Sequence, residues 1–129
     1  LHIGQSDGDP AVVREALGPD RLLGVSVSSR AELDAIAATG CADVVGLSPV
    51  WSTTTKTDTA PALGLEGVRE LLAARPAGLP AVAIGGINAT NAAEVIATGV
   101  DGICVVSAIA AATRPREAAA RLKELWEKP

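Results

Sequence analysis

Hydroxyl groups and one lysine are concentrated in a short stretch of this 129-residue sequence, VWSTTTKTD at positions 50–58. Thr53 and Thr55 offer two hydroxyl donors there, and Lys56 offers a mobile cation. Lysine serves a phosphate as a point charge with several hydrogen bonds. The stretch alone favours a solvated threonine-rich loop, so its surroundings must decide between a loop and an anion site.

Two other turns are suited to an anion. Gly85-Gly86 follows an apolar run and lets the backbone approach a ligand closely. Val106-Ser107 stands at the end of the next apolar run and opens a short helical pattern, where a hydroxyl and free amides favour an anion. A tight turn would explain the two glycines alone. The second turn, 21 residues later, favours a phosphate site.

An aspartate, a serine and a histidine lie in the N-terminal part. Asp7 follows the first apolar run and suits Mg²⁺, which takes one or two carboxylates plus phosphate oxygens. The sequence Asp7-Gly8-Asp9 is equally typical of a turn. His2, the only histidine, lies within the first run, which favours a structural role. No Ser/His/Asp set or general base is evident, which favours chemistry driven by metal and charge stabilisation.

Alternating strands and helices would have to position these groups. Five apolar runs rich in Val and Ile predict strands buried on both faces of a parallel α/β sheet, at residues 1–3, 22–27, 43–47, 81–84 and 102–106. Capping residues (Asp9, Ser29 and Asn91 among them) and Gly or Pro stops predict helices over 11–17, 30–39, 64–74, 92–98 and from 115 onward. This alternation indicates a doubly wound sheet or a (β/α)8 barrel, and no GxGxxG follows the first run. In both folds, ligands bind at the C-terminal ends of the strands.

Composition excludes other classes. A formal charge of −4 argues against nucleic acid as the partner, and no apolar run approaches the roughly 20 residues that span a bilayer. A single cytoplasmic domain over residues 1–129, without membrane contact, is the expectation. Cys41 and Cys104 predict two buried thiols rather than a disulfide or a metal pair. The chain begins at Leu1 and has no methionine, which suggests that an N-terminal portion is missing.

Five segments resemble, in order and spacing, the second part of the thiamine-phosphate synthase family: HIGQSD (2–7), GVSVSS (24–29), VVGLSPVWSTTTKTD (44–58), AVAIGGIN (81–88) and DGICVVSAI (101–109). The resemblance implies a (β/α)8 TIM barrel, of which this chain covers about the last five βα units. It implies a Mg²⁺-dependent transferase that couples hydroxymethylpyrimidine diphosphate to hydroxyethylthiazole phosphate, giving thiamine phosphate and diphosphate. The bond to diphosphate would break first, and the thiazole nitrogen would capture the pyrimidine carbocation.

The resemblance also implies roles for single residues. Asp7 would bind Mg²⁺, and Ser26 and Lys56 would be catalytic residues close to the diphosphate. The substrates would be bound by Thr53, Thr55, Lys56, Gly86, Val106 and Ser107. The first three βα units of the family, which have no counterpart here, would supply a second Mg²⁺ ligand and further basic residues.

Two alternatives remain open. One is a thiazole tautomerase-like isomerase, whose catalytic histidine would be expected near position 48, where this chain has Ser48. The other is an inactive fragment that only binds phosphate. The expected partners are phosphorylated small molecules. Because bare sheet edges attract further strands, a homo-oligomer or pairing with a missing N-terminal segment is also expected.

Overall fold

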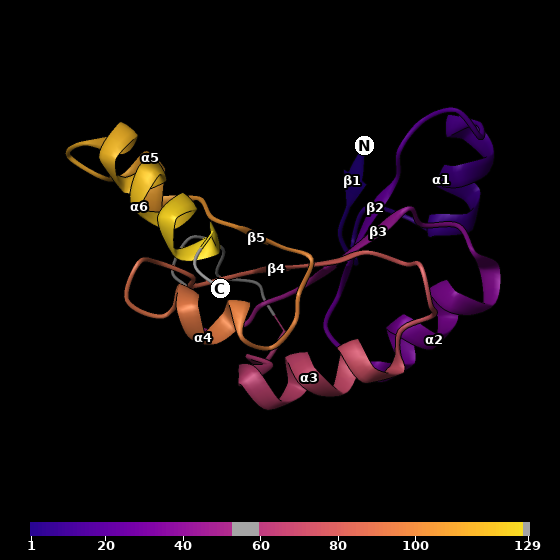
Figure 1. Ribbon diagram of the computed structural model, residues 1–129. Coiled ribbons are helices and arrows are strands. Elements are labelled where there is room, and N and C mark those ends of the chain that lie inside the picture. Colours follow the sequence, from indigo (N-terminus) through magenta and orange to yellow (C-terminus); the bar gives the residue numbers. More distant parts are fainter. Residues whose placement is uncertain (53–59, 128–129) are drawn as a thin grey trace.

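Strands and helices alternate along the chain in the computed structural model, which describes residues 1–52 and 60–127 (Figure 1). The strands are β1 (His2–Ile3), β2 (Gly24–Val27), β3 (Val44–Leu47), β4 (Ala81–Ile84) and β5 (Gly102–Cys104). The helices are α1 (Pro10–Leu17), α2 (Arg30–Thr39), α3 (Gly64–Ala74), α4 (Ala92–Ile96), α5 (Ser107–Ala110) and α6 (Pro115–Glu127). The five strands and the larger helices lie where the sequence predicts them. Within the described ranges, no helix combines the length and the apolarity needed to cross a membrane.

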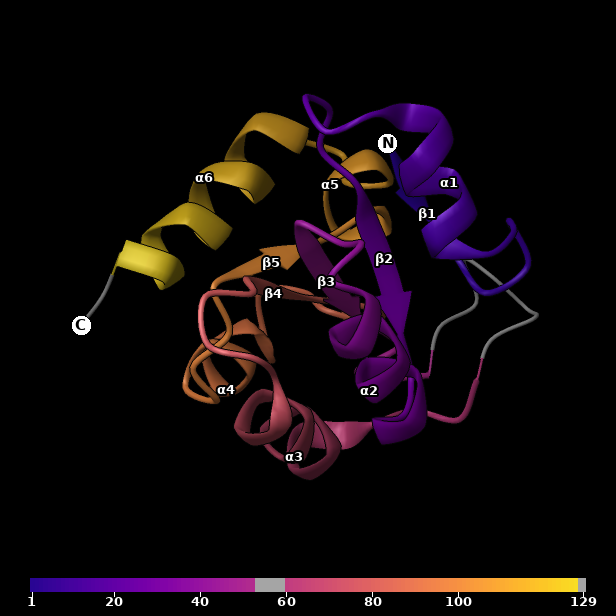
Figure 2. The same cartoon turned by 90° about the vertical axis from the view of Figure 1, so that its right-hand side faces the viewer.

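The five strands form one parallel sheet in the order β1-β2-β3-β4-β5. Figure 2 shows α2, α3 and α4 following one side of this sheet. In a doubly wound fold the strand order reverses and helices cover both faces. A strand order that runs in one direction, with the crossover helices on one side, is instead the arrangement of a (β/α)8 barrel segment. The parallel α/β class is confirmed, and the barrel alternative is favoured.

The hydrophobic core lies between the sheet and these helices. Alternate strand residues such as Val25, Val27 and Val45 are 0–2% exposed and belong to one cluster with Leu33 of α2 and Val68 of α3. Successive side chains of a strand point to opposite faces, so the residues between them point away from the helices. The core therefore fixes which strand residues face the opposite side.

Burial on both faces of the sheet, as predicted from the apolar runs, is wrong. On the face opposite the core, His2 and Cys104 are exposed, and Ser26 and Val82 are partly exposed. The expectation of two buried thiols is therefore correct for Cys41 alone. The physical reason is position, because Cys104 ends an edge strand and lies on the side that the crossover helices do not cover.

Most helix ends follow the capping signals in the sequence. Asp9 accepts hydrogen bonds from the amides of Ala11 and Val12, and Ser29 accepts one from the amide of Glu32. At α4 the expected cap is wrong, because Asn91 makes no side-chain capping bond to the helix. Its Oδ1 instead accepts from the Asn88 amide at 2.9 Å, so this side chain holds the preceding loop.

Two aspartate–arginine pairs fasten the N-terminal edge of the sheet. Asp43, immediately before β3, accepts at Oδ2 from the Leu23 amide at 2.7 Å and from the Arg14 guanidinium of α1. Asp101, immediately before β5, accepts in the same way from the Ala81 amide at 2.8 Å and from Arg75. The Leu23 amide and then Arg14 lower the pKa of Asp43 below its usual value. Arg75 and then the Ala81 amide lower the pKa of Asp101.

These pairs predict a loss of stability in acid. A carboxyl whose pKa is lower in the folded state stabilises the fold above its unfolded pKa of about 3.9, and this contribution disappears as the pH falls through the folded pKa. Asp43→Asn should therefore lower the thermal midpoint at pH 7, and its difference from the parent should shrink below about pH 4. Asp20→Asn is the control, because Asp20 is exposed and makes no hydrogen bond within the described ranges. A pH-independent difference would contradict the account.

Candidate functional site

The C-terminal ends of the parallel strands gather the predicted site residues at one edge of the sheet. Asp7 follows β1, Ser26 lies in β2, Gly86 follows β4 and Ser107 begins α5. Thr53, Thr55 and Lys56 lie outside the described residues, so their predicted roles stay predictions. The structure therefore brings the other predicted residues to one edge.

A hollow of about 440 Å³ lies at the ends of β1, β2 and β3. Its walls are about equally polar and apolar, and among the described residues no lysine or arginine lines it. The described lining residues are Gly4, Gln5, Ser6, Ser26, Val27, Ser28, Glu32, Ser48, Pro49 and Ala60. Hydroxyl and amide donors of this kind can orient an anion, but its charge must be balanced from elsewhere.

Ser26 is the predicted residue with the most defined surroundings. Its Oγ lies 3.0 Å from Nε2 of His2, and its carbonyl oxygen accepts a hydrogen bond from Nε2 of Gln5 at 2.7 Å. The contact with His2 was missed in the sequence, where the histidine was expected to be structural. The signal lies in the register: His2 pairs with Gly24, and Ser26, two residues further along β2, shares that face.

Glu32 is a second lining residue that the sequence reasoning missed. Its Oε2 accepts from the Ser28 amide at 2.6 Å and from the Ser28 hydroxyl at 2.9 Å. The Ser29 hydroxyl in turn accepts from the amide of Glu32. Together these bonds resemble a capping box, except that Glu32 bonds to the amide of Ser28 instead of the amide of the cap residue Ser29. The spacing Ser29-x-x-Glu32 was the available signal. Glu32 thus holds the loop after β2 and is also one of the residues that line the hollow.

Asp7 forms the turn that the sequence offered as one of its two roles. Its Oδ2 accepts from the Gly4 amide at 2.7 Å, and its own amide donates to the Gly4 carbonyl at 3.2 Å. The described residues contain no group of three or more His, Cys, Asp or Glu side chains that could hold a metal by themselves. A single exposed carboxylate fits Mg²⁺ where substrate phosphates provide the other ligands. Asp7 fits that role.

Gly85 and Gly86 form the turn after β4, where φ is +104° and +68°. A Cβ on Gly86 would lie 2.6 Å from the Cβ of Trp51, so the segment after β3 passes directly over this turn. The Trp51 amide donates to the Gly85 carbonyl at 3.0 Å, and Nδ2 of Asn91 donates to the Gly86 carbonyl at 3.0 Å. The glycines are therefore required by packing whether or not a phosphate binds.

Val106 and Ser107 lie beside this turn. Ile84 pairs with Cys104 in the sheet, so Gly86 and Val106 each lie two residues beyond the last pair. Both Val106 and Ser107 are exposed. Because α5 is only four residues long, its dipole is small, and the amides and the Ser107 hydroxyl are the groups that could contact an anion.

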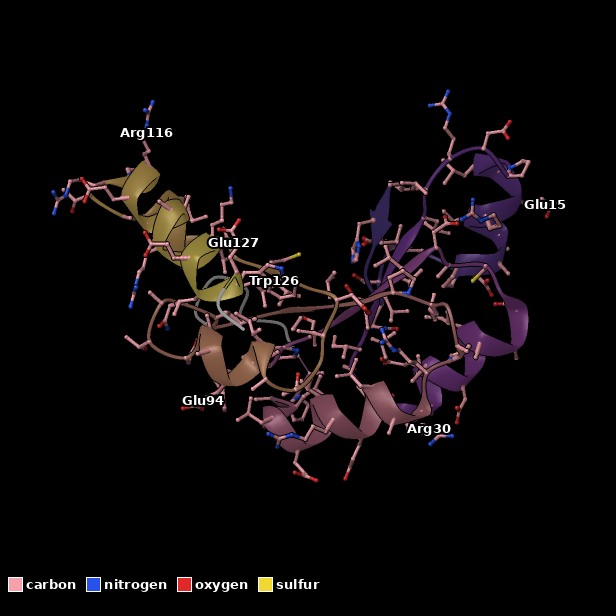
Figure 3. All side chains as sticks on the ribbon, viewed as in Figure 1. Glu15, Arg30, Glu94, Arg116, Trp126 and Glu127 are labelled. Atoms are coloured by element: carbon pink, nitrogen blue, oxygen red, sulfur yellow. The ribbon has the colours of Figure 1, made fainter. Side chains whose placement is uncertain are left out.

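Several other charged side chains point outward from the helices. Figure 3 shows Glu15, Arg30, Glu94 and Arg116 pointing outward from α1, α2, α4 and α6. Surface charges of this kind are solvated and screened. These charges account for the solvated outer surfaces of the helices, so the C-terminal ends of the strands remain the candidate site.

The fold is that of a (β/α)8 barrel, of which this chain contains five βα units, and polar residues lie at the C-terminal ends of its strands. Residues 1–109 match the family described as thiamine monophosphate synthase, and the chain belongs to that family.

Individual relatives agree. The chain is 48% identical to the thiamine-phosphate synthase of Laribacter hongkongensis, over 98% of this chain and 56% of that protein. It is 47% identical to the thiamine biosynthesis multifunctional protein ThiED of Corynebacterium glutamicum, over 98% of this chain and 18% of that protein. The solved thiamine phosphate pyrophosphorylase from Pyrococcus furiosus superposes with a TM-score of 0.86 at 38% identity, covering 98% of this chain and 58% of that one. The chain thus spans little more than half the length of the synthase relatives.

The turn after β4 provides a stability test. Gly86→Ala should lower the free energy of unfolding by about 2–6 kcal/mol, because left-handed strain and overpacking each cost about 1–3 kcal/mol. Gly78→Ala is the matched control, since Gly78 has φ +84° and nothing within 4 Å of the added Cβ. That control should lose only about 1–2 kcal/mol in denaturant unfolding. Equal losses of unfolding free energy in the two variants would show that contact with Trp51 does not restrict the residue at position 86.

Proposed function

We propose that this chain carries part of the active site of a thiamine-phosphate synthase. The reaction couples hydroxymethylpyrimidine diphosphate to hydroxyethylthiazole phosphate and yields thiamine phosphate and diphosphate. The observation that carries the proposal is the family match over residues 1–109, together with the polar residues at the C-terminal edge of the sheet. Because the relatives are longer, the activity of the whole protein is part of the proposal.

The reaction makes limited demands on proton transfer. Breaking the bond between the pyrimidine methylene carbon and diphosphate leaves a carbocation, and the thiazole nitrogen then forms the new carbon–nitrogen bond. Charge develops on the departing diphosphate, so donors fixed in advance lower the barrier. Holding the two rings together contributes the remaining advantage. The hydroxyl and amide groups that line the hollow support this chemistry, and the Glu32 carboxylate in the same lining is engaged by the Ser28 amide and hydroxyl.

The roles divide along the strand edge. Ser26 donates its hydroxyl toward the diphosphate, close to the reacting carbon. The amides and the hydroxyl near Gly86, Val106 and Ser107 hold the thiazole phosphate. The family resemblance assigns the remaining contacts to Thr53, Thr55 and Lys56. It is the sole basis for these roles, since the three residues lie outside the described residues. Lys56 would supply the positive charge that the described walls of the hollow lack.

Mg²⁺ belongs to the same proposal. When bound, it would neutralise charge on the diphosphate oxygens. Asp7 would hold it with one carboxylate oxygen while Oδ2 accepts from the Gly4 amide, which keeps the loop after β1 in place. A cytoplasmic location, expected from the sequence, stays a prediction.

The two edge strands suggest how the site is completed. Within the described sheet, β1 and β5 each pair with one neighbour only, and such edges attract further strands. We propose that they are covered by further βα units, from polypeptide outside these 129 residues or from a second copy of the chain. Sedimentation of the isolated chain should show a dimer or larger species. A monomer at high micromolar concentration would contradict the second-copy arrangement.

The activity is tested by mixing the protein with both substrates and Mg²⁺ and measuring thiamine phosphate by chromatography. The assay uses the chain and the longest natural polypeptide that contains it. Lys56→Ala should lower kcat about 100-fold or more, as expected when a group that stabilises developing charge is removed. Lys123→Ala is the control, because Lys123 pairs with Glu127 on the outer helix α6. No product from the longer polypeptide would refute the synthase assignment, and full activity of Lys56→Ala would refute the role of that lysine.

A further inference from the structure

The single histidine lies next to the proposed site. His2 extends over the face of the sheet opposite the core, where its Nε2 is 3.0 Å from the Ser26 hydroxyl oxygen. Its position in β1 is fixed by pairing with Gly24, and the sheet register sets Ser26 beside Gly46. The side chains of His2 and Ser26 therefore contact each other across the adjacent strands β1 and β2, next to the hollow that Ser26 lines.

Two strand glycines make room for the imidazole ring. A Cβ on Gly24 would lie 2.3 Å from Nδ1 of His2, and a Cβ on Gly46 would lie 3.2 Å from its Cε1. Neither glycine has a positive φ, so backbone conformation does not require glycine at either position. Glycine inside a strand also weakens the sheet and often marks a close approach. Space for the ring is the physical reason that the structure offers for both.

The other ring nitrogen has a different environment. Nδ1 faces the backbone at Gly24, and no carboxylate within the described residues is hydrogen-bonded to it. In a Ser–His–Asp triad, a carboxylate on Nδ1–H orients the ring so that the bare Nε2 removes the serine proton. That orienting group is missing from the described surroundings of His2. The geometry thus disfavours a serine nucleophile activated by His2.

We propose that His2 is a positioning residue for Ser26. The neutral ring carries its proton on Nε2 and donates it to the Ser26 Oγ, so that the serine hydroxyl hydrogen points into the hollow. Linked hydrogen bonds polarise one another, so this arrangement strengthens donation from Ser26 to an anionic oxygen. Gln5 holds the Ser26 carbonyl at 2.7 Å and fixes the backbone of the same residue. The benefit to the reaction rests on the proposed synthase function, whereas the hydrogen-bond direction does not.

The hydrogen-bond direction is tested first by ¹⁵N NMR of the imidazole, at a pH where the ring is neutral. The chain contains one histidine, so its two ring signals are unambiguous. The proposal predicts the Nε2–H tautomer, with an Nε2 signal that shifts in Ser26→Ala. A proton on Nδ1, with Nε2 as the acceptor, would overturn the proposal. Because this measurement needs no turnover, it decides the inference even if the synthase assignment fails.

The effect on turnover is tested by a double-mutant cycle. His2→Ala should lower kcat about 10- to 100-fold, the range for losing a hydrogen bond that supports a charged group, with little change in KM for the thiazole phosphate. His2→Gln, which places an amide N–H near the position of Nε2, should restore much of the loss. In the Ser26→Ala background, His2→Ala should have little further effect. Equal losses in both backgrounds, or no rescue by glutamine, would overturn the positioning role.

A glycine pair separates ring placement from general strand damage. Gly24→Ala should reproduce the kcat loss of His2→Ala, because the added methyl group occupies the place of the ring. Gly102→Ala is the matched control: Gly102 lies in β5, where a Cβ would contact Val82 at 3.1 Å and not the histidine. Comparable kcat values for the two glycine variants, at comparable thermal midpoints, would contradict the inference that Gly24 makes room for the imidazole ring.

Discussion

Parallel pairing in register is the constraint on which the rest of this molecule depends. Each strand of the sheet pairs with the next one in sequence, so five separate segments deliver their C-terminal ends to one edge. The crossover helices α2, α3 and α4 lie on one side of the sheet, and the opposite face carries polar residues such as His2 and Ser26 beside apolar ones such as Val82. The hollow, the glycine turn and the Ser26–His2 contact all follow from this arrangement.

The N-terminal and C-terminal ends of the strands, which form two opposite edges of the sheet, have different roles. At the N-terminal edge, Asp43 and Asp101 connect a strand amide to an arginine, which fastens neighbouring βα units with local hydrogen bonds. At the C-terminal edge, polar residues line a hollow. Glycine serves both packing and site: Gly86 admits the segment after β3, and Gly24 admits an imidazole ring.

Much of this could be predicted from local sequence signals. Apolar runs identified the strands, and Asp9 and Ser29 identified two helix starts, because these signals act within a few residues. The exposure of Cys104 and the meeting of His2 with Ser26 could not be predicted as easily, since both depend on strand register and on which face the helices cover. The prediction that Asn91 caps α4 was wrong for a related reason: its side chain bonds to the amide of Asn88 in the preceding loop instead.

The central claim is that the C-terminal strand edge binds phosphorylated substrate, and amide chemical-shift mapping with hydroxyethylthiazole phosphate tests it most directly. The account predicts saturable shifts at Gly86, Val106 and Ser107, with the amides of Leu23 and Ala81 at the opposite edge unchanged. Inorganic phosphate at the same ionic strength serves as the reference for non-specific binding. Shifts confined to the opposite edge, or no saturable shift at millimolar ligand, would contradict the account.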